Sequence, residues 1–183
     1  MNKDLKIHII GFFIISIIGT LVHFTYELSN YTYLVGLFSA INESVFEHLK
    51  LLVFGIVIFM IYEHIVYRGN SRYIFSKLIA IISGIITILV IFYTYTFFTK
   101  TEIVIVDIII FYFSVLISQI ISYMILKGKI FKNLSNSNIV RKHSKYLFIL
   151  IIIIFFFFTF YPPKLRIFKD PKTGTYGVLK LEY

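Results

Sequence analysis

Two ionisable residues at the end of the first apolar segment are spaced so that they can act together. His23 and Glu27 are four residues apart, so in a helix both side chains lie on one face. A neutral histidine nitrogen and a carboxylate oxygen together suit Zn²⁺ or another divalent transition metal. The same two side chains can also hydrogen-bond to each other at a helix end, so both interpretations stay open.

A second polar run opens the next apolar segment, and its sequence from Asn42 to Lys50 is NESVFEHLK. In one interpretation, Ser44 is the N-cap of a helix and Glu47 is its third residue, which makes a capping box. Acidic residues near a helix start also interact favourably with the positive end of the helix dipole. This interpretation gives the run a structural role.

In the other interpretation, Asn42 is the cap, and Glu43 and Glu47 lie one turn apart on the same face. Two carboxylates so placed repel each other unless they share a proton or a cation. Either one is then a candidate general base. His48 lies about 100° around the helix from Glu47, so a regular helix does not let these two residues bind one ion.

Asp107 lies among aliphatic residues, in the run IVIVDIII from Ile103 to Ile110. A carboxyl group in such surroundings needs a partner, a proton or water. We expect it at the same depth as the groups above, unless it simply reaches up to the membrane interface. The candidate metal ligands are therefore His23, Glu27 and Asp107. The candidate general bases are Glu43 and Glu47, and the two further motif residues are Asn42 and His48.

The composition requires a lipid environment for these groups. Of the 183 residues, 58% are hydrophobic and only 15% are charged, and the mean hydropathy is +0.88. A soluble domain of this size cannot bury that much apolar surface. The chain has no cysteine, which excludes disulfides, thiolate metal sites and cysteine nucleophiles.

Five segments of the chain are long and apolar enough to cross the hydrocarbon layer, which takes about 20 residues in a helix. Backbone groups in lipid must pair within their own segment, so we expect helices. The sequence therefore predicts an all-α integral membrane bundle in residues 1–161. The predicted helices are approximately Leu5–Thr25, Leu49–Tyr67, Tyr73–Thr99, Ile103–Leu126 and Lys145–Tyr161.

A tail of residues 162–183 follows the bundle. Pro162-Pro163 ends the last helix, because proline cannot continue it. Leu165–Phe168 and Thr175–Leu181 flank a segment rich in turn residues, a pattern that predicts a short β-hairpin.

The distribution of Lys and Arg predicts the orientation. The amino end, the second loop and the fourth loop are basic, so they are expected on the cytoplasmic side. This puts the amino terminus in the cytoplasm and the tail on the opposite side of the membrane, although the tail is also basic. With a net charge of +9, the expected partner is the lipid bilayer and not nucleic acid. A homo-oligomer or a membrane protein partner stays open.

Two parts of the chain resemble the motifs of an uncharacterised family of small bacterial membrane proteins. The first part is HFTYE at His23–Glu27 with FSAINESVFEHLK at Phe38–Lys50. The second is YPP at Tyr161–Pro163, followed by FKDP at Phe168–Pro171 and GTYG at Gly174–Gly177. The resemblance implies a membrane location and points to these motif residues, but it implies no activity.

Three functions remain open at this point. The protein can have a non-catalytic structural or partner-binding role, in which the acidic residues only cap helices and anchor interfaces. It can be a metal-dependent hydrolase with an outward-facing site of His, Glu and Asp residues and a divalent ion such as zinc. It can also be a component of proton- or cation-coupled transport. Whether it is an enzyme is not decided by the sequence.

Overall fold

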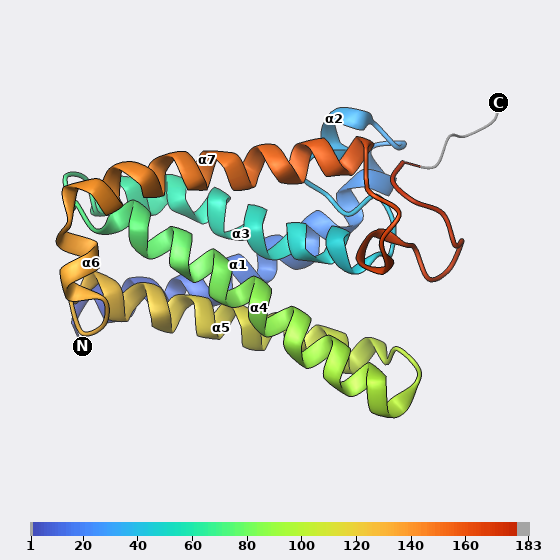
Figure 1. Ribbon diagram of the computed structural model, residues 1–183, viewed down its shortest axis with the longest axis horizontal. Helices are drawn as coiled ribbons and strands as arrows, with labels where there is room; N and C mark the ends of the chain where they lie inside the picture. The colour runs from blue at the N-terminus through green and yellow to red at the C-terminus, as the bar shows by residue number, and fades with distance from the viewer. Residues whose placement is uncertain (1, 179–183) are drawn as a thin grey trace.

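The computed structural model describes residues 2–178, and five long helices run along its long axis (Figure 1). By length and composition, all five can cross a membrane, which confirms the predicted all-helical architecture with five apolar helices. These helices are α1 (Lys3–Leu28), α3 (Val45–Val66), α4 (Tyr73–Thr99), α5 (Val104–Leu126) and α7 (Asn138–Phe160).

Three short helical elements lie at the ends of the bundle. The α2 helix (Tyr33–Gly36) lies between α1 and α3, and α6 (Lys132–Asn136) lies between α5 and α7. A 3-10 turn, η1 (Arg166–Phe168), follows α7. We call the end that contains the start of α1 and all of α6 the amino end, and the opposite end the site end.

Two helices begin earlier than their apolar residues predict, and a serine cap explains each start. The α3 helix begins at Val45, where the Ser44 side chain accepts a hydrogen bond from the backbone N–H of Glu47. The α7 helix begins at Asn138, capped by Ser137. Capping satisfies backbone donors at the polar end of a helix, so the helix need not begin with its apolar part.

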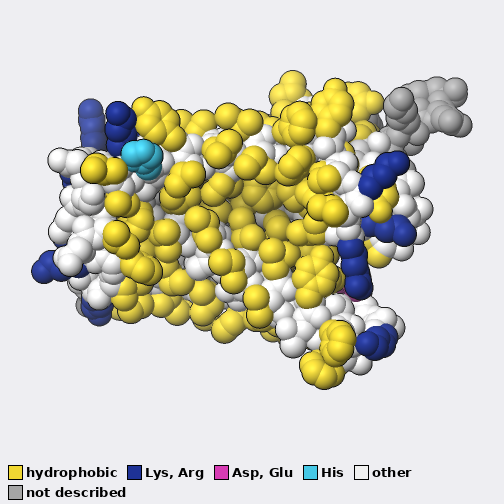
Figure 2. Space-filling model, viewed as in Figure 1, with side chains coloured by type: hydrophobic (Ala, Val, Ile, Leu, Met, Phe, Trp, Pro, Cys, Tyr) yellow, Lys and Arg dark blue, Asp and Glu magenta, His cyan; other side chains and the backbone are white. Residues whose placement is uncertain are grey.

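The surface has the pattern expected of a protein surrounded by hydrocarbon. Hydrophobic side chains cover the middle of the visible face, and Lys and Arg gather at its two ends (Figure 2). Of the most apolar stretch of 18 residues in α7, only 17% is buried inside the protein. Large apolar side chains such as Ile105 and Ile153 are exposed.

The α4 and α5 helices approach each other closely at a glycine. The Ser118 hydroxyl on α5 donates a hydrogen bond of 2.8 Å to the Ala80 carbonyl on α4. A Cβ atom on Gly84 would contact Ser118 and would lie 2.6 Å from a methyl group of Leu52. Small residues and interhelical hydrogen bonds of this kind hold helices together in membranes, where hydrophobic surface alone gives little driving force.

The predicted β-hairpin in the tail is not supported by the structure. Over the described part of the tail, pairing is limited to one isolated antiparallel bridge between Lys169 and Tyr176. Phe168 instead packs against Phe46 and Phe158, with ring centroids 4.5 and 5.3 Å apart. Burial of this ring bends the chain into the η1 turn. The last residues of the second predicted strand, 179–181, lie outside the described residues.

The close approach at Gly84 gives a first prediction. Gly84→Ala should destabilise the detergent-solubilised protein by about 1–3 kcal/mol, because overpacking forces neighbouring groups to move. Thermal unfolding followed by circular dichroism measures the change. Ser83→Ala, one residue away, is the matched control, since the Ser83 hydroxyl donates to the Ala80 carbonyl within its own helix. Equal melting temperatures for Gly84→Ala and the wild type would contradict this account of the contact.

Candidate metal site

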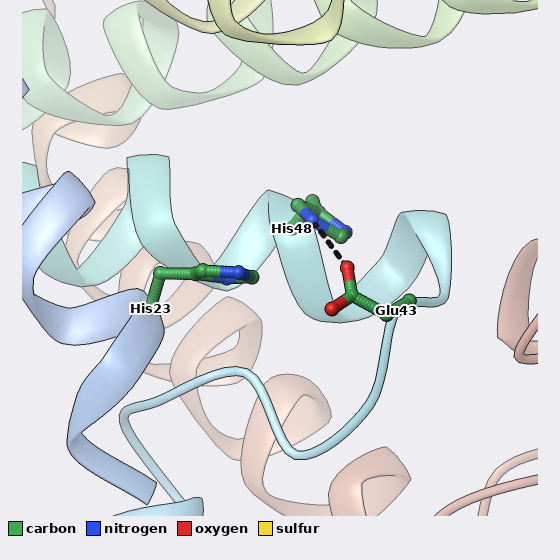
Figure 3. Close-up of side chains that lie close together, drawn as sticks. All are labelled: His23, Glu43 and His48. Carbon is green, nitrogen blue, oxygen red and sulfur yellow. Dashed lines mark ion pairs between the residues drawn. The ribbon is translucent and has the colours of Figure 1, made fainter. Parts of the chain in front are cut away.

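Three potential metal ligands converge at the site end (Figure 3). His23 comes from the last turns of α1, Glu43 from the loop before α3, and His48 from the first turn of α3. One ligand atom from each residue lies within 4.8 Å of the others. The Nε2 atom of His48 is 3.5 Å from a carboxylate oxygen of Glu43, and the two imidazole rings lie 5.2 Å apart. Small side-chain movements would bring all three groups to one ion.

The His48 imidazole is held in the orientation of a metal ligand. Its Nδ1 lies 3.0 Å from the backbone carbonyl of Ser44. A carbonyl can only accept, so Nδ1 carries a proton, and Nε2, the nitrogen that faces Glu43, is the atom that an ion would use. Histidine ligands of metals usually donate their other N–H to a carbonyl or carboxylate in this way. The Nδ1 atom of His23 is buried and makes no hydrogen bond within the described residues.

Glu43 is held in its charged form. Burial by itself would raise the pKa of its carboxyl group, but a hydrogen bond from Lys172 and the neighbouring imidazoles outweigh burial and lower that pKa below its usual value. The Lys172 ammonium is 3.0 Å from one carboxylate oxygen, and the other oxygen is the one that faces His48. The hydrogen bond to Glu43 raises the pKa of Lys172, so this ion pair persists at neutral pH.

A buried ion pair fixes the loop that carries Glu43. The Lys50 ammonium lies 2.6 Å from the Glu47 carboxylate, and both side chains are almost fully buried. Glu47 also accepts a hydrogen bond of 3.0 Å from the backbone N–H of Ile41. Lys50 donates to the Gly36 carbonyl at 2.7 Å and to the Thr159 hydroxyl at 3.1 Å. The pair therefore joins the loop, α3 and α7.

Asn42 connects this loop to the tail. Its side-chain oxygen accepts a hydrogen bond of 2.9 Å from the Ser44 N–H, and its amide nitrogen donates to the Gly177 carbonyl at 3.0 Å. Glu43 lies between these two anchored residues, Asn42 and Ser44, so its backbone has little freedom. The tail segment that carries Lys172 is held to the same point.

A serine holds the loop beside His23. The Ser39 hydroxyl donates to the Val22 carbonyl at 2.5 Å and accepts from the Tyr26 N–H at 3.1 Å. These bonds fold the loop back against the last turns of α1. Sequence spacing alone gives no sign of this contact, which is why Glu43 was not predicted to join His23 as a ligand.

The other predicted site residues lie elsewhere. Glu47 is a predicted general base, and the structure places its carboxylate in a buried ion pair with Lys50, outside the group of converging ligands. Glu27 is exposed, and Asp107 accepts a hydrogen bond of 2.5 Å from Tyr95. Neither of these two acids belongs to the group of converging ligands found among the described residues.

The fold and this cluster define a class: a helical protein of the membrane-spanning type with a pair of histidines and a glutamate gathered at one end. More particularly, the chain belongs to the family of unknown function DUF6512, whose model matches residues 1–178. This confirms the membership in an uncharacterised family that the motifs predicted. Comparison with curated proteins and with solved structures gave no match.

The buried pair gives a second prediction. Lys50→Met should destabilise the protein by about 3–5 kcal/mol, because it leaves the Glu47 carboxylate buried without its cation. The double variant Glu47→Gln/Lys50→Met should recover part of this loss, since neither buried charge remains. Thermal unfolding in detergent measures both values.

Lys129→Met is the matched control, because Lys129 is exposed at the amino end and should tolerate the change. A loss for Lys50→Met no larger than that of the control would show that the Glu47–Lys50 pair does not hold the loop.

Proposed function

We propose that this is a multi-pass membrane protein that binds one divalent transition-metal ion through His23, Glu43 and His48. The convergence of the three ligand atoms within 4.8 Å is the observation that supports this proposal. Two imidazoles and one carboxylate are a ligand set of catalytic zinc sites, which keep their fourth position for water. Zn²⁺ is accordingly the ion that suits this site best.

The chemistry we propose is hydrolysis of a small or lipid-like substrate. Zinc lowers the pKa of its bound water to about 7, which makes hydroxide available at neutral pH. Two further acids, Asp107 near the start of α5 and Glu27 near the end of α1, lie at the same end of the bundle as the ligands. Either carboxylate can accept the proton of the water, a role that replaces the one predicted for Glu47.

The orientation is part of the proposal. Residues 1–161 would form the transmembrane domain, with the amino end in the cytoplasm of a bacterial cell and the site end outside. The supporting observation is the number of basic residues at the amino end, as the positive-inside rule requires. Residues 162–183 would be the extracytoplasmic tail. The basic residues at the amino end are Lys3, Lys6, Arg68, Arg72, Lys127, Lys129, Lys132, Arg141, Lys142 and Lys145.

A transport function has less support from the structure. A second buried ion pair, Lys77 with Glu63 at 2.6 Å, lies near the amino end of the bundle, where α3 ends and α4 begins. Glu63 is about 24 Å along α3 from Glu47, at about 1.5 Å per residue. The buried residues of α3 between Lys50 and Glu63 are all apolar, so this helix offers no polar path between the two pairs.

The metal site gives a third prediction. Purified wild-type protein should bind one equivalent of Zn²⁺, measured by elemental analysis after removal of excess metal. His23→Ala, His48→Ala and Glu43→Gln should each lose at least tenfold in affinity, because each removes a ligand.

Glu27→Gln and Asp107→Asn are the matched controls, because they remove acids at the same end that are outside the ligand group. Size-exclusion profiles establish that every variant is folded. If the wild-type protein contains no zinc, or if the Glu27 variant loses as much zinc affinity as the ligand variants, the proposed site is wrong. A structural or partner-binding role would then explain the motif better.

Hydrolysis gives a fourth prediction. Zinc-loaded protein should cleave p-nitrophenyl acetate or a short-chain phosphatidylcholine faster than metal-free protein, and Glu43→Gln should reduce this rate at least 100-fold. Rates that are identical with and without zinc for both substrates would argue against hydrolysis of these ester classes. The binding of zinc itself is decided separately by the elemental analysis.

A further inference from the structure

A groove on α7 at the amino end combines basic and apolar side chains. The groove is open and has a volume of about 460 Å³. At about 100° per residue, the side chains around it fall within an arc of about 140° on the helix. The lining residues are Asn138, Arg141, Lys142, Lys145, Tyr146 and Ile149.

The basic side chains of this groove have no protein counter-ion. Within the described residues, no ion pair involves Arg141, Lys142 or Lys145. Two acids at the same end of the bundle are already engaged: Asp4 pairs with Lys127, and Glu63 pairs with Lys77. Lys142 and Lys145 are exposed, and the half-buried Arg141 donates to the neutral side chain of Asn138. Within the part of the chain that the structure describes, no carboxylate therefore neutralises these three cations.

The groove changes from polar to apolar along the helix. Tyr146 and Ile149 follow the basic residues along α7, and 61% and 55% of their surfaces are exposed. Ile149 is four positions after Lys145, which is about 6 Å along the helix axis. That distance is close to the thickness of one headgroup layer, about 5–7 Å. A molecule with an anionic head and an apolar chain would match both parts.

We propose that this groove binds an anionic phospholipid of the surrounding bilayer. Arg141, Lys142 and Lys145 hold the headgroup phosphate, and the exposed side chains of Tyr146 and Ile149 contact the acyl chain. Polybasic segments beside membrane helices attract anionic lipids in this way. The proposal is independent of the metal site, which lies at the other end of the bundle.

Native mass spectrometry of the detergent-solubilised protein tests this proposal, with dioleoylphosphatidylglycerol and dioleoylphosphatidylcholine as probes. Wild-type protein should retain phosphatidylglycerol at least tenfold more tightly than phosphatidylcholine. Arg141→Gln/Lys145→Gln should weaken phosphatidylglycerol binding about 30-fold, since each basic residue near an anionic lipid contributes about fivefold. Ile149→Gln should also weaken it, although no charge is lost.

The matched control is Lys129→Gln/Lys132→Gln, which removes the same charge from the same end of the bundle but outside the groove. This variant should bind phosphatidylglycerol as the wild type does. An equal loss in the control would show a general charge effect and overturn the proposal. Complete displacement of the lipid by millimolar inorganic phosphate, with no effect of Ile149→Gln, would show an anion site and would also overturn it.

Discussion

The cost of a buried charge controls the architecture of the site end. Glu47 and Lys50 are both withdrawn from solvent, and either charge alone would be expensive to bury. Their mutual contact and their bonds to the backbone at Gly36 and Ile41 compensate that cost. These bonds can form only when the loop between α1 and α3 folds back over the bundle. The loop conformation, and with it the position of Glu43, follows from this requirement.

Neighbouring residues of the motif at the start of α3, Asn42–Lys50, have different roles. Glu47 stabilises the loop, and Ser44 caps the helix. Glu43 and His48 are left with free ligand atoms that face each other. They are five positions apart in the sequence, and they can meet because Glu43 precedes the helix while His48 lies in its first turn. The region that looks from the sequence like a simple capping box thus also contains two of the three proposed ligands.

Helix number and type were predictable from the sequence because the hydrocarbon layer imposes a length and an apolar composition on each segment. The polar ends of helices were less predictable, since capping by Ser44 and Ser137 depends on single side chains. For the site, His23 was predicted as a ligand, and His48 was noted only as a motif residue. Their meeting depends on a long-range contact through Ser39, which sequence spacing does not reveal.

X-ray absorption spectroscopy at the zinc K-edge tests the central claim most directly, because it reports the atoms bound to the ion. For the zinc-loaded protein we predict a four-coordinate shell with two imidazole nitrogens at about 2.0–2.1 Å and oxygen ligands for the remainder. Loss of one imidazole in both His23→Ala and His48→Ala would agree with this shell. A shell of oxygen atoms alone, without imidazole scattering in the wild type, would contradict the account.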